Sequence, residues 1–185
     1  LVVRADSILI YATTEEGFFR AGSTLGQLLI NDQTGKYFSG CRITDWPAFR
    51  VRGFMHDCGR SFIPLDELKR EIEMLSGFKI NTFHWHLTED LAWRLASDIV
   101  PEVTGPGATL RDNNGYYTRE EVKEFVRFCN DHFVEVIPEI DMPGHSAAFT
   151  RATGHSMQSE EGRKILAQLL REACTLFEGS YFHIG

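Results

Sequence analysis

From residue 51 onward, short apolar segments alternate with longer segments that have helical spacing, and this alternation limits the possible folds more than any other feature. Strands are expected at residues 51–57, 80–87 and 134–141, helices at residues 64–77, 118–132 and 162–177, and the start of a fourth strand at residues 181–185. Strands that alternate with helices form parallel βα units. The sequence therefore predicts an α/β protein.

Two architectures fit these units. Four βα units in order make up half of an eight-stranded (β/α)8 barrel, and they also fit an open, doubly wound sheet. Periodicity does not separate the two. The chain has no glycine-rich phosphate loop of the GxGxxG or GxxxxGK type, which weakens the nucleotide-binding form of the doubly wound sheet.

The first 48 residues follow a different pattern. A strand-like run at residues 8–11 precedes a segment with helical spacing at residues 17–30, and a turn-rich connection is expected at residues 35–47. The chain begins with Leu1 and stops inside an apolar run. Because domain boundaries prefer exposed linkers, we expect the sequence to be a piece of a longer protein.

Composition excludes several classes of protein. The 185 residues are 43% hydrophobic and 24% charged, as in soluble globular domains. A net charge of −7 argues against nucleic acid as a partner. No apolar run reaches the roughly 18 residues that span a membrane. The four cysteines form no CxxC pair and are expected to be separate buried thiols, and no motif calls for a cofactor.

Each expected strand delivers a charged or titratable group just past its C-terminal end. These groups are Asp57 and Arg60 after the first strand, Glu89 and Asp90 after the second, and Asp141 and His145 after the third. In a parallel barrel, the C-terminal ends of the strands meet at one mouth, where active sites lie. An arginine, several carboxylates and a histidine at one mouth suit a polar, hydroxyl-rich ligand.

Each of these residues also has an ordinary structural interpretation. Arg60 can be a surface charge beside a helix, and Glu89 with Asp90 can favour the start of a following helix. Asp141 before a proline can form a turn, and a lone His145 can be a structural histidine. These alternatives stay open on the sequence alone.

His84 and His86 share one face of their strand because side chains alternate along it. Such a pair binds metal in some barrel hydrolases, which leaves a metal-dependent hydrolase as one reading. No third ligand is obvious. We therefore expect both rings inside the barrel, hydrogen-bonded to neighbours, with no metal.

Six motifs in order give the chain a resemblance to the retaining β-N-acetylhexosaminidases of glycoside hydrolase family 20. They are RGFMHDCGRSF at residues 52–62, KIN followed by HWHLTED at residues 79–90, WR at residues 93–94, YYT at residues 116–118, VIPEIDMPGH at residues 136–145 and FHIG at residues 182–185. The resemblance covers nearly the whole chain. It implies that residues 1–48 end a small α+β domain and that residues 49–185 form the first half of a (β/α)8 TIM barrel, truncated in strand 4.

The resemblance also implies a reaction, the removal of terminal β-linked N-acetylglucosamine or N-acetylgalactosamine from a glycan or glycoconjugate. In this family the acetamido oxygen of the substrate attacks the anomeric carbon, an exception to the usual two-carboxylate scheme. An Asp orients the acetamido group and the neighbouring Glu protonates the leaving oxygen. That Glu needs a pKa raised toward working pH.

Roles follow for residues that match the motifs. Arg60 would bind hydroxyls of the sugar, and Glu89 with His145 would form a supporting pair behind the catalytic acid. Asp90, Asp141 and His86 would lie behind the site or at its rim. Two positions depart from the family pattern, because Glu89 stands where Asp is commoner and Ser61 where His is common.

The catalytic Asp-Glu pair of the family is expected two and three residues after Gly185, so the 185-residue chain alone is expected to be inactive. The open edges of a half-barrel are expected to make it self-associate. A non-catalytic carbohydrate-binding or interaction protein on the same scaffold and a relative resembling lacto-N-biosidases are the alternatives. Family membership implies a periplasmic, secreted or lysosomal location, but the sequence does not choose among them.

Overall fold

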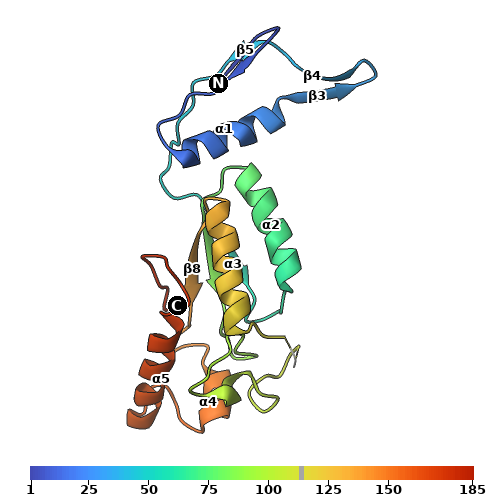
Figure 1. Ribbon diagram of the computed structural model, residues 1–185. Coiled ribbons are helices and arrows are strands. Elements are labelled where there is room, and N and C mark those ends of the chain that lie inside the picture. Colours follow the sequence, from blue (N-terminus) through green and yellow to red (C-terminus); the bar gives the residue numbers. More distant parts are fainter. Residues whose placement is uncertain (113–114) are drawn as a thin grey trace.

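The computed structural model describes residues 1–112 and 115–185, and its centre is a parallel sheet (Figure 1). The sheet contains β6 (Gly53–Asp57), β7 (Thr82–His86) and β8 (Glu135–Glu139) in that spatial order. Residues Asp57, His86 and Glu139 are neighbours in the register of the three strands. All three strands therefore end at the same edge, as the alternating pattern predicts.

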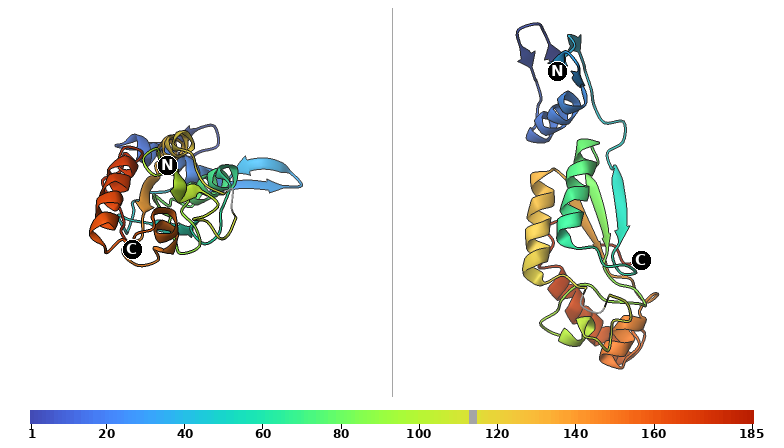
Figure 2. Two further views of the ribbon diagram at one scale, coloured as in Figure 1. Left: turned by 90° about the horizontal axis from the view of Figure 1, so that it is seen from below. Right: turned by 90° about the vertical axis from the view of Figure 1, so that its right-hand side faces the viewer.

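The crossover helices α2 (Leu65–Gly77) and α3 (Arg119–Asp131) lie side by side on one face of this sheet (Figure 2). Phe83 and Trp85 point toward them and are fully buried. The Trp85 ring lies 4.8 Å from the ring of Phe125 on α3, and the Trp85 indole donates to Cys58 Sγ at 3.3 Å. The core thus fills the space between sheet and helices.

The predicted start of α3 is confirmed in detail. Thr118 is its N-cap, and the Thr118 hydroxyl and the Glu121 side chain bond each other's backbone N–H groups in a capping box. The start of α2 differs, because Pro64 occupies the N-cap position without a side-chain bond. Proline is tolerated there because the first N–H groups of a helix have no intrahelical partner.

The segments beyond β7 and β8 form the lower part of Figure 1. A short 3-10 helix, η1 (Pro101–Thr104), follows β7 and packs against α4 (Ala147–Thr153), a helix the sequence analysis missed. The last predicted helix is α5 (Glu160–Ala173). The expected strand at residues 181–185 appears only as a single parallel bridge between His183 and Glu139.

The N-terminal residues form a separate layer at the top of Figure 1. A small antiparallel sheet has the order β2 (Ile8–Leu9), β1 (Val2–Val3), β5 (Cys41–Arg42). The expected helix at residues 17–30 is α1 (Glu15–Gln27), which begins earlier because Thr14 caps it, and a hairpin follows. The predicted connection at residues 35–47 was wrong in part, because it contains β5 and β4 (Gly35–Phe38), which pairs with β3 (Leu29–Asp32).

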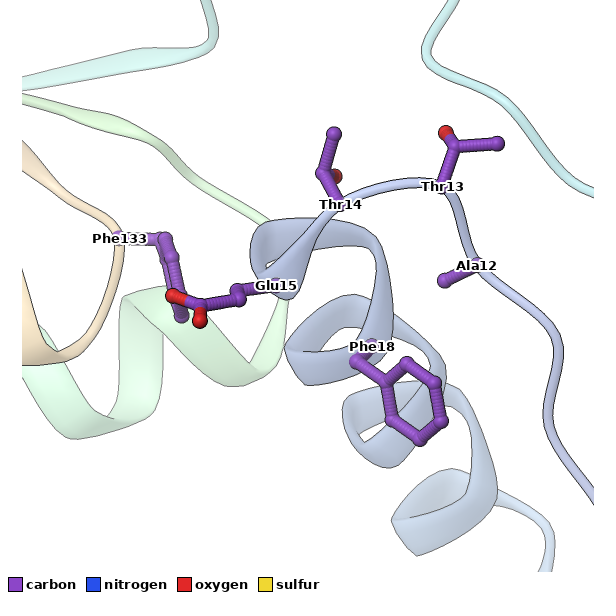
Figure 3. Close-up of a pocket in the computed structure, with 6 residues that line it drawn as sticks. All are labelled: Ala12, Thr13, Thr14, Glu15, Phe18 and Phe133. Atoms are coloured by element: carbon purple, nitrogen blue, oxygen red, sulfur yellow. The ribbon is translucent and has the colours of Figure 1, made fainter.

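Helix α1 contacts the sheet domain at the N-terminal ends of the strands. The Arg20 guanidinium donates to the carbonyl oxygen of Ser76, in the last turn of α2, at 3.2 Å. It also donates to the carbonyl oxygen of Phe133, in the turn after α3, at 2.5 Å. A cation is stabilised at such carbonyl-rich ends. An open, mainly apolar hollow nearby is lined by Ala12, Thr13, Thr14, Glu15, Phe18 and Phe133 (Figure 3).

The cysteines only partly match the prediction of buried thiols. All four are free; Cys58 and Cys129 are buried, Cys41 is half-buried and Cys174 is exposed. Cys174 follows α5 on the outer surface, where the helical pattern ends. Among the helices of the described residues, none has the length and apolar character needed to cross a bilayer.

Candidate functional site

The turn after β6 brings Arg60 to the end of β7. The backbone N–H groups of Cys58 and Gly59 both donate to the His86 carbonyl, at 3.0 and 3.1 Å. A Cβ atom on Gly59 would lie 2.9 Å from Glu89 Cβ and 3.1 Å from the Thr88 carbonyl carbon. Only glycine therefore lets the two segments approach this closely.

A buried carboxylate stands at the centre of the site. The Glu89 side chain is 3% exposed and contacts the Arg60 guanidinium through Oε1. The same oxygen lies 2.7 Å from His145 Nδ1, while Glu89 Oε2 accepts the backbone N–H of Asp90. Because a buried carboxylate is unfavourable without partners, these three contacts explain how Glu89 stays inside. The structure thus brings the predicted Arg60, Glu89 and His145 together.

The loop after β8 carries His145 to this carboxylate. His145 has a φ of 42°, a left-handed conformation that is unfavourable for a residue with a Cβ atom. The Ala147 backbone N–H donates to Asp90 Oδ1 at 3.0 Å, and the Ser146 hydroxyl donates to the Pro143 carbonyl at 2.8 Å. These bonds hold the loop in the strained conformation. Asp90, 52% exposed, lies at the rim.

Three histidines surround Glu139 on the face of the sheet opposite α2 and α3. Glu139 Oε2 lies 2.5 Å from His84 Nε2 and 2.9 Å from His86 Nδ1, and Oε1 lies 3.2 Å from His183 Nδ1. Burial, the largest influence, raises the pKa of Glu139, but the histidines together outweigh it and the pKa lies below its ordinary value. Glu139 is therefore a buried anion balanced by imidazole rings.

The sequence showed no third metal ligand beside His84 and His86, and the structure brings Glu139 and His183 close to them. Two nitrogen or oxygen ligands about 2.0–2.2 Å from a tetrahedral zinc ion lie roughly 3.3–3.5 Å apart. The 2.5 and 2.9 Å separations from Glu139 to His84 and His86 are shorter and suit direct contact. The imidazole and carboxylate groups are thus close enough for direct contact, and His84, Glu139 and His183 also form a group whose ligand atoms lie within 4.8 Å of one another, as a metal site requires.

Asp141 lies behind the site, next to this cluster. It is 8% exposed, and its backbone N–H donates to the Thr88 hydroxyl at 3.0 Å. One carboxylate oxygen of Asp141 lies within 4.8 Å of ligand atoms of both His86 and Glu139. Of the two aspartates expected behind the site or at its rim, Asp141 is thus the inner one and Asp90 the outer one.

Arg94, which was not among the predicted site residues, binds the backbone of the segments around the site. Its side chain is fully buried and donates to four backbone carbonyls, those of Cys58 at 3.0 Å, Arg111 at 3.0 Å, Asp112 at 3.1 Å and Gly115 at 2.7 Å. A fork of five N–H groups suits this task. Arg94 thereby ties the turn that carries Arg60 to the long loop after β7.

Sequence reasoning placed Asp57 at the mouth of the strands without giving it a role, and it omitted Glu139. The signal for Asp57 was its place at a strand end, three residues before Arg60. The signal for Glu139 was its even spacing from Glu135, which puts it on the open face of β8. His183 joins the cluster through a long-range bridge that spacing within one strand does not reveal.

The site therefore consists of a half-exposed guanidinium on a buried carboxylate, with a histidine beside it, at the C-terminal ends of parallel strands. A model of the catalytic domain of glycosyl hydrolase family 20 matches residues 49–163. The chain belongs to glycosyl hydrolase family 20. The resemblance seen in the sequence motifs is thus confirmed.

Relatives of this family 20 chain include two bacterial β-hexosaminidases. It is 36% identical to a β-hexosaminidase of Porphyromonas gingivalis over 172 residues, which cover 79% of this chain and 22% of the relative. It is 33% identical to a β-hexosaminidase of Vibrio furnissii, matching all of this chain and 36% of the relative. The chain thus spans about a fifth to somewhat over a third of these relatives.

Solved structures give the same result. A chitobiase of Flavobacterium johnsoniae is 36% identical and superimposes with a TM-score of 0.93, over all of this chain and 30% of that one. An exo-β-N-acetylglucosaminidase of Vibrio harveyi, solved with N-acetylglucosamine, is 31% identical with a TM-score of 0.91 and covers all of this chain and 35% of that one. The mixed α/β fold of this chain is therefore that of family 20.

Proposed function

We propose that the protein carrying this chain is a retaining β-N-acetylhexosaminidase, which removes terminal β-linked N-acetylglucosamine or N-acetylgalactosamine by substrate-assisted catalysis. The arrangement of Arg60, Glu89 and His145 in a family 20 chain carries the proposal. The Vibrio harveyi relative, named for exo-β-N-acetylglucosaminidase activity, supports the choice of sugar.

In this proposal each group has a distinct task. Arg60, with a side chain 48% exposed, binds hydroxyls of the terminal sugar through its outward N–H groups. Glu89 and His145 support the general acid by fixing a hydrogen-bonded carboxylate and imidazole behind it. Nδ1 of His145 faces Glu89, which leaves Nε2 as the ring nitrogen available to that acid. We place the acid and the acetamido-orienting aspartate outside residues 1–185.

We also propose that residues 49–185 form the first half of a (β/α)8 barrel and that residues 1–48 belong to a preceding small domain. Two observations support the barrel over a doubly wound sheet. The strand order β6, β7, β8 follows the sequence without a reversal, and α2 and α3 cover the same face (Figure 2). A polar open face with Glu139, His84 and His86 suits a barrel interior.

The test uses the complete polypeptide encoded by the gene, assayed with chromogenic aryl β-N-acetylglucosaminide and β-N-acetylgalactosaminide. We expect release of the aryl group, and proton NMR of the first product should show the β-anomer. Glu89→Gln should lower kcat/KM on the order of 10- to 1,000-fold, because the His145 imidazole loses its charged partner. Glu67→Gln, the same change on the exposed side of α2, is the control.

Absence of aryl release from the folded, complete protein would refute the enzymatic proposal. Binding of N-acetylglucosamine without turnover would point instead to a non-catalytic carbohydrate-binding protein. Activity of the complete protein that Glu89→Gln leaves unchanged would refute the role of the Glu89–His145 pair while leaving the reaction intact.

A further inference from the structure

Arg60 is held from two sides, and Asp57 provides one of them. Arg60 Nη1 lies 2.5 Å from Asp57 Oδ2, while Nη2 contacts Glu89. The Arg60 backbone N–H also donates to Asp57 Oδ1 at 2.9 Å. Asp57 therefore contacts both the backbone and the tip of the same arginine.

We infer that Asp57 is a positioning residue, which orients the Arg60 guanidinium so that its remaining N–H groups face a pair of neighbouring hydroxyls on the substrate. The inference rests on the proposed function and deepens it. A guanidinium has five N–H groups, and each terminal nitrogen carries two. Because Asp57 and Glu89 each take one terminal nitrogen, one N–H remains free on both.

Glu89 alone is a poor anchor for this task. Its Oε1 already faces His145 Nδ1 at 2.7 Å, and its Oε2 accepts the Asp90 N–H, so Arg60 shares an oxygen with the histidine. A half-exposed arginine that is fixed at one end keeps much of its rotational freedom. Asp57 supplies the second fixed point without competing for the Glu89–His145 contact.

The charges of the two residues agree with this role. The hydrogen bond that Arg60 donates to Asp57, together with the charges of nearby carboxylates, raises the pKa of Arg60. Burial raises the pKa of Asp57, but Arg60 and His86 outweigh it and the pKa falls below its ordinary value. Asp57 is therefore an anion across the neutral range.

A purely local role for Asp57 is the competing explanation. An aspartate that accepts the N–H of the third residue along the chain stabilises a turn, whatever that residue does. Asparagine keeps this acceptor but has no negative charge. Asp57→Asn thus separates the turn from the ion pair.

The experiment measures kcat and KM of the complete protein for an aryl β-N-acetylglucosaminide and for its 3-deoxy, 4-deoxy and 6-deoxy analogues. We expect Asp57→Asn to raise KM about tenfold with a smaller fall in kcat, as for a partly exposed charged hydrogen bond. The penalty should disappear on the same deoxy analogues on which Arg60→Lys has no further effect. Asp131→Asn, on the exposed end of α3, is the matched control.

An equal loss on all four substrates would overturn the inference and make Asp57 a turn residue only. Unchanged KM would overturn it as well. Thermal unfolding of each variant separates a folding defect from a binding defect, because a positioning role predicts a midpoint close to that of the unaltered protein. Failure of the unaltered protein to hydrolyse any substrate would instead refute the proposed function.

Discussion

Replacing Arg94 tests whether the site depends on a buried cation that never meets the substrate. Its side chain is fully buried and holds four backbone carbonyls. In Arg94→Met, the carbonyls of Arg111, Asp112 and Gly115 lie in a loop that can turn to water. The Cys58 carbonyl belongs to a fully buried residue and cannot reach water in the same way.

The magnitude follows from that difference. One buried carbonyl without a partner lowers the free energy of unfolding by about 1–3 kcal/mol. Loss of the three hydrogen bonds to the loop, partly offset by the entropy that the freed loop regains, lowers it by about 1 kcal/mol more. A total near 3 kcal/mol lowers the unfolding midpoint by roughly 6–12 °C in a domain of this size. Arg94→Lys should fall close to Arg94→Met, because one ammonium nitrogen cannot replace a planar fork.

Thermal unfolding followed by circular dichroism measures both variants, with Arg111→Met as the control because that side chain is exposed in the same loop. KM should also rise in Arg94→Met, since the loosened Cys58 turn carries Arg60. A midpoint within about 1 °C of the unaltered protein would show that the four bonds contribute little to stability.

Three further predictions concern other parts of the chain. Thr118→Ala removes the capping box of α3 and should lower the free energy of unfolding by about 1 kcal/mol in urea denaturation, whereas Thr118→Ser should retain most of it. Because the pKa of Glu139 is depressed in the folded state, its contribution to stability is present above about pH 4.5 and is lost as pH falls below that value. Glu139→Gln should therefore flatten the fall of the unfolding midpoint between about pH 5 and 3.5. An unchanged slope would contradict this prediction. The 185-residue polypeptide alone should form dimers or larger species in light scattering, because within residues 1–112 and 115–185 β6 pairs only with β7 and exposes Phe54 and Met55. It should also release no aryl group. A monodisperse monomer would contradict the first expectation, and turnover would contradict the second.

The sheet domain could be predicted because its signals are local. Apolar spacing placed β7, β8 and α2 to within about two residues, and the Thr118–Glu121 box fixed the start of α3. The N-terminal hairpin escaped prediction because its strands are short and mostly exposed, so they lack a marked apolar pattern. Helix α4 escaped because seven residues give too few turns to show a period.

The site was predictable where one motif supplied one residue. Arg60, Glu89 and His145 each follow a strand, and the parallel register brings them together. The contacts that hold them depend on distances across the fold, as between Arg94 and Gly115 or Glu139 and His183. Such pairs leave no periodic trace in a single sequence.

Helix α1 docks at the N-terminal ends of the strands, which we call the holding end of the molecule. Arg20 fastens α1 to the carbonyls of Ser76 and Phe133, and Figure 1 shows α1 above the sheet domain. Arg60 and Glu89 follow the C-terminal ends of β6 and β7. Tyr11, 76% exposed beside α1, offers an attachment point on the holding end. A protein immobilised there would present the edge that carries Arg60 and Glu89 to the solution, where a dissolved ligand can reach it without passing the support.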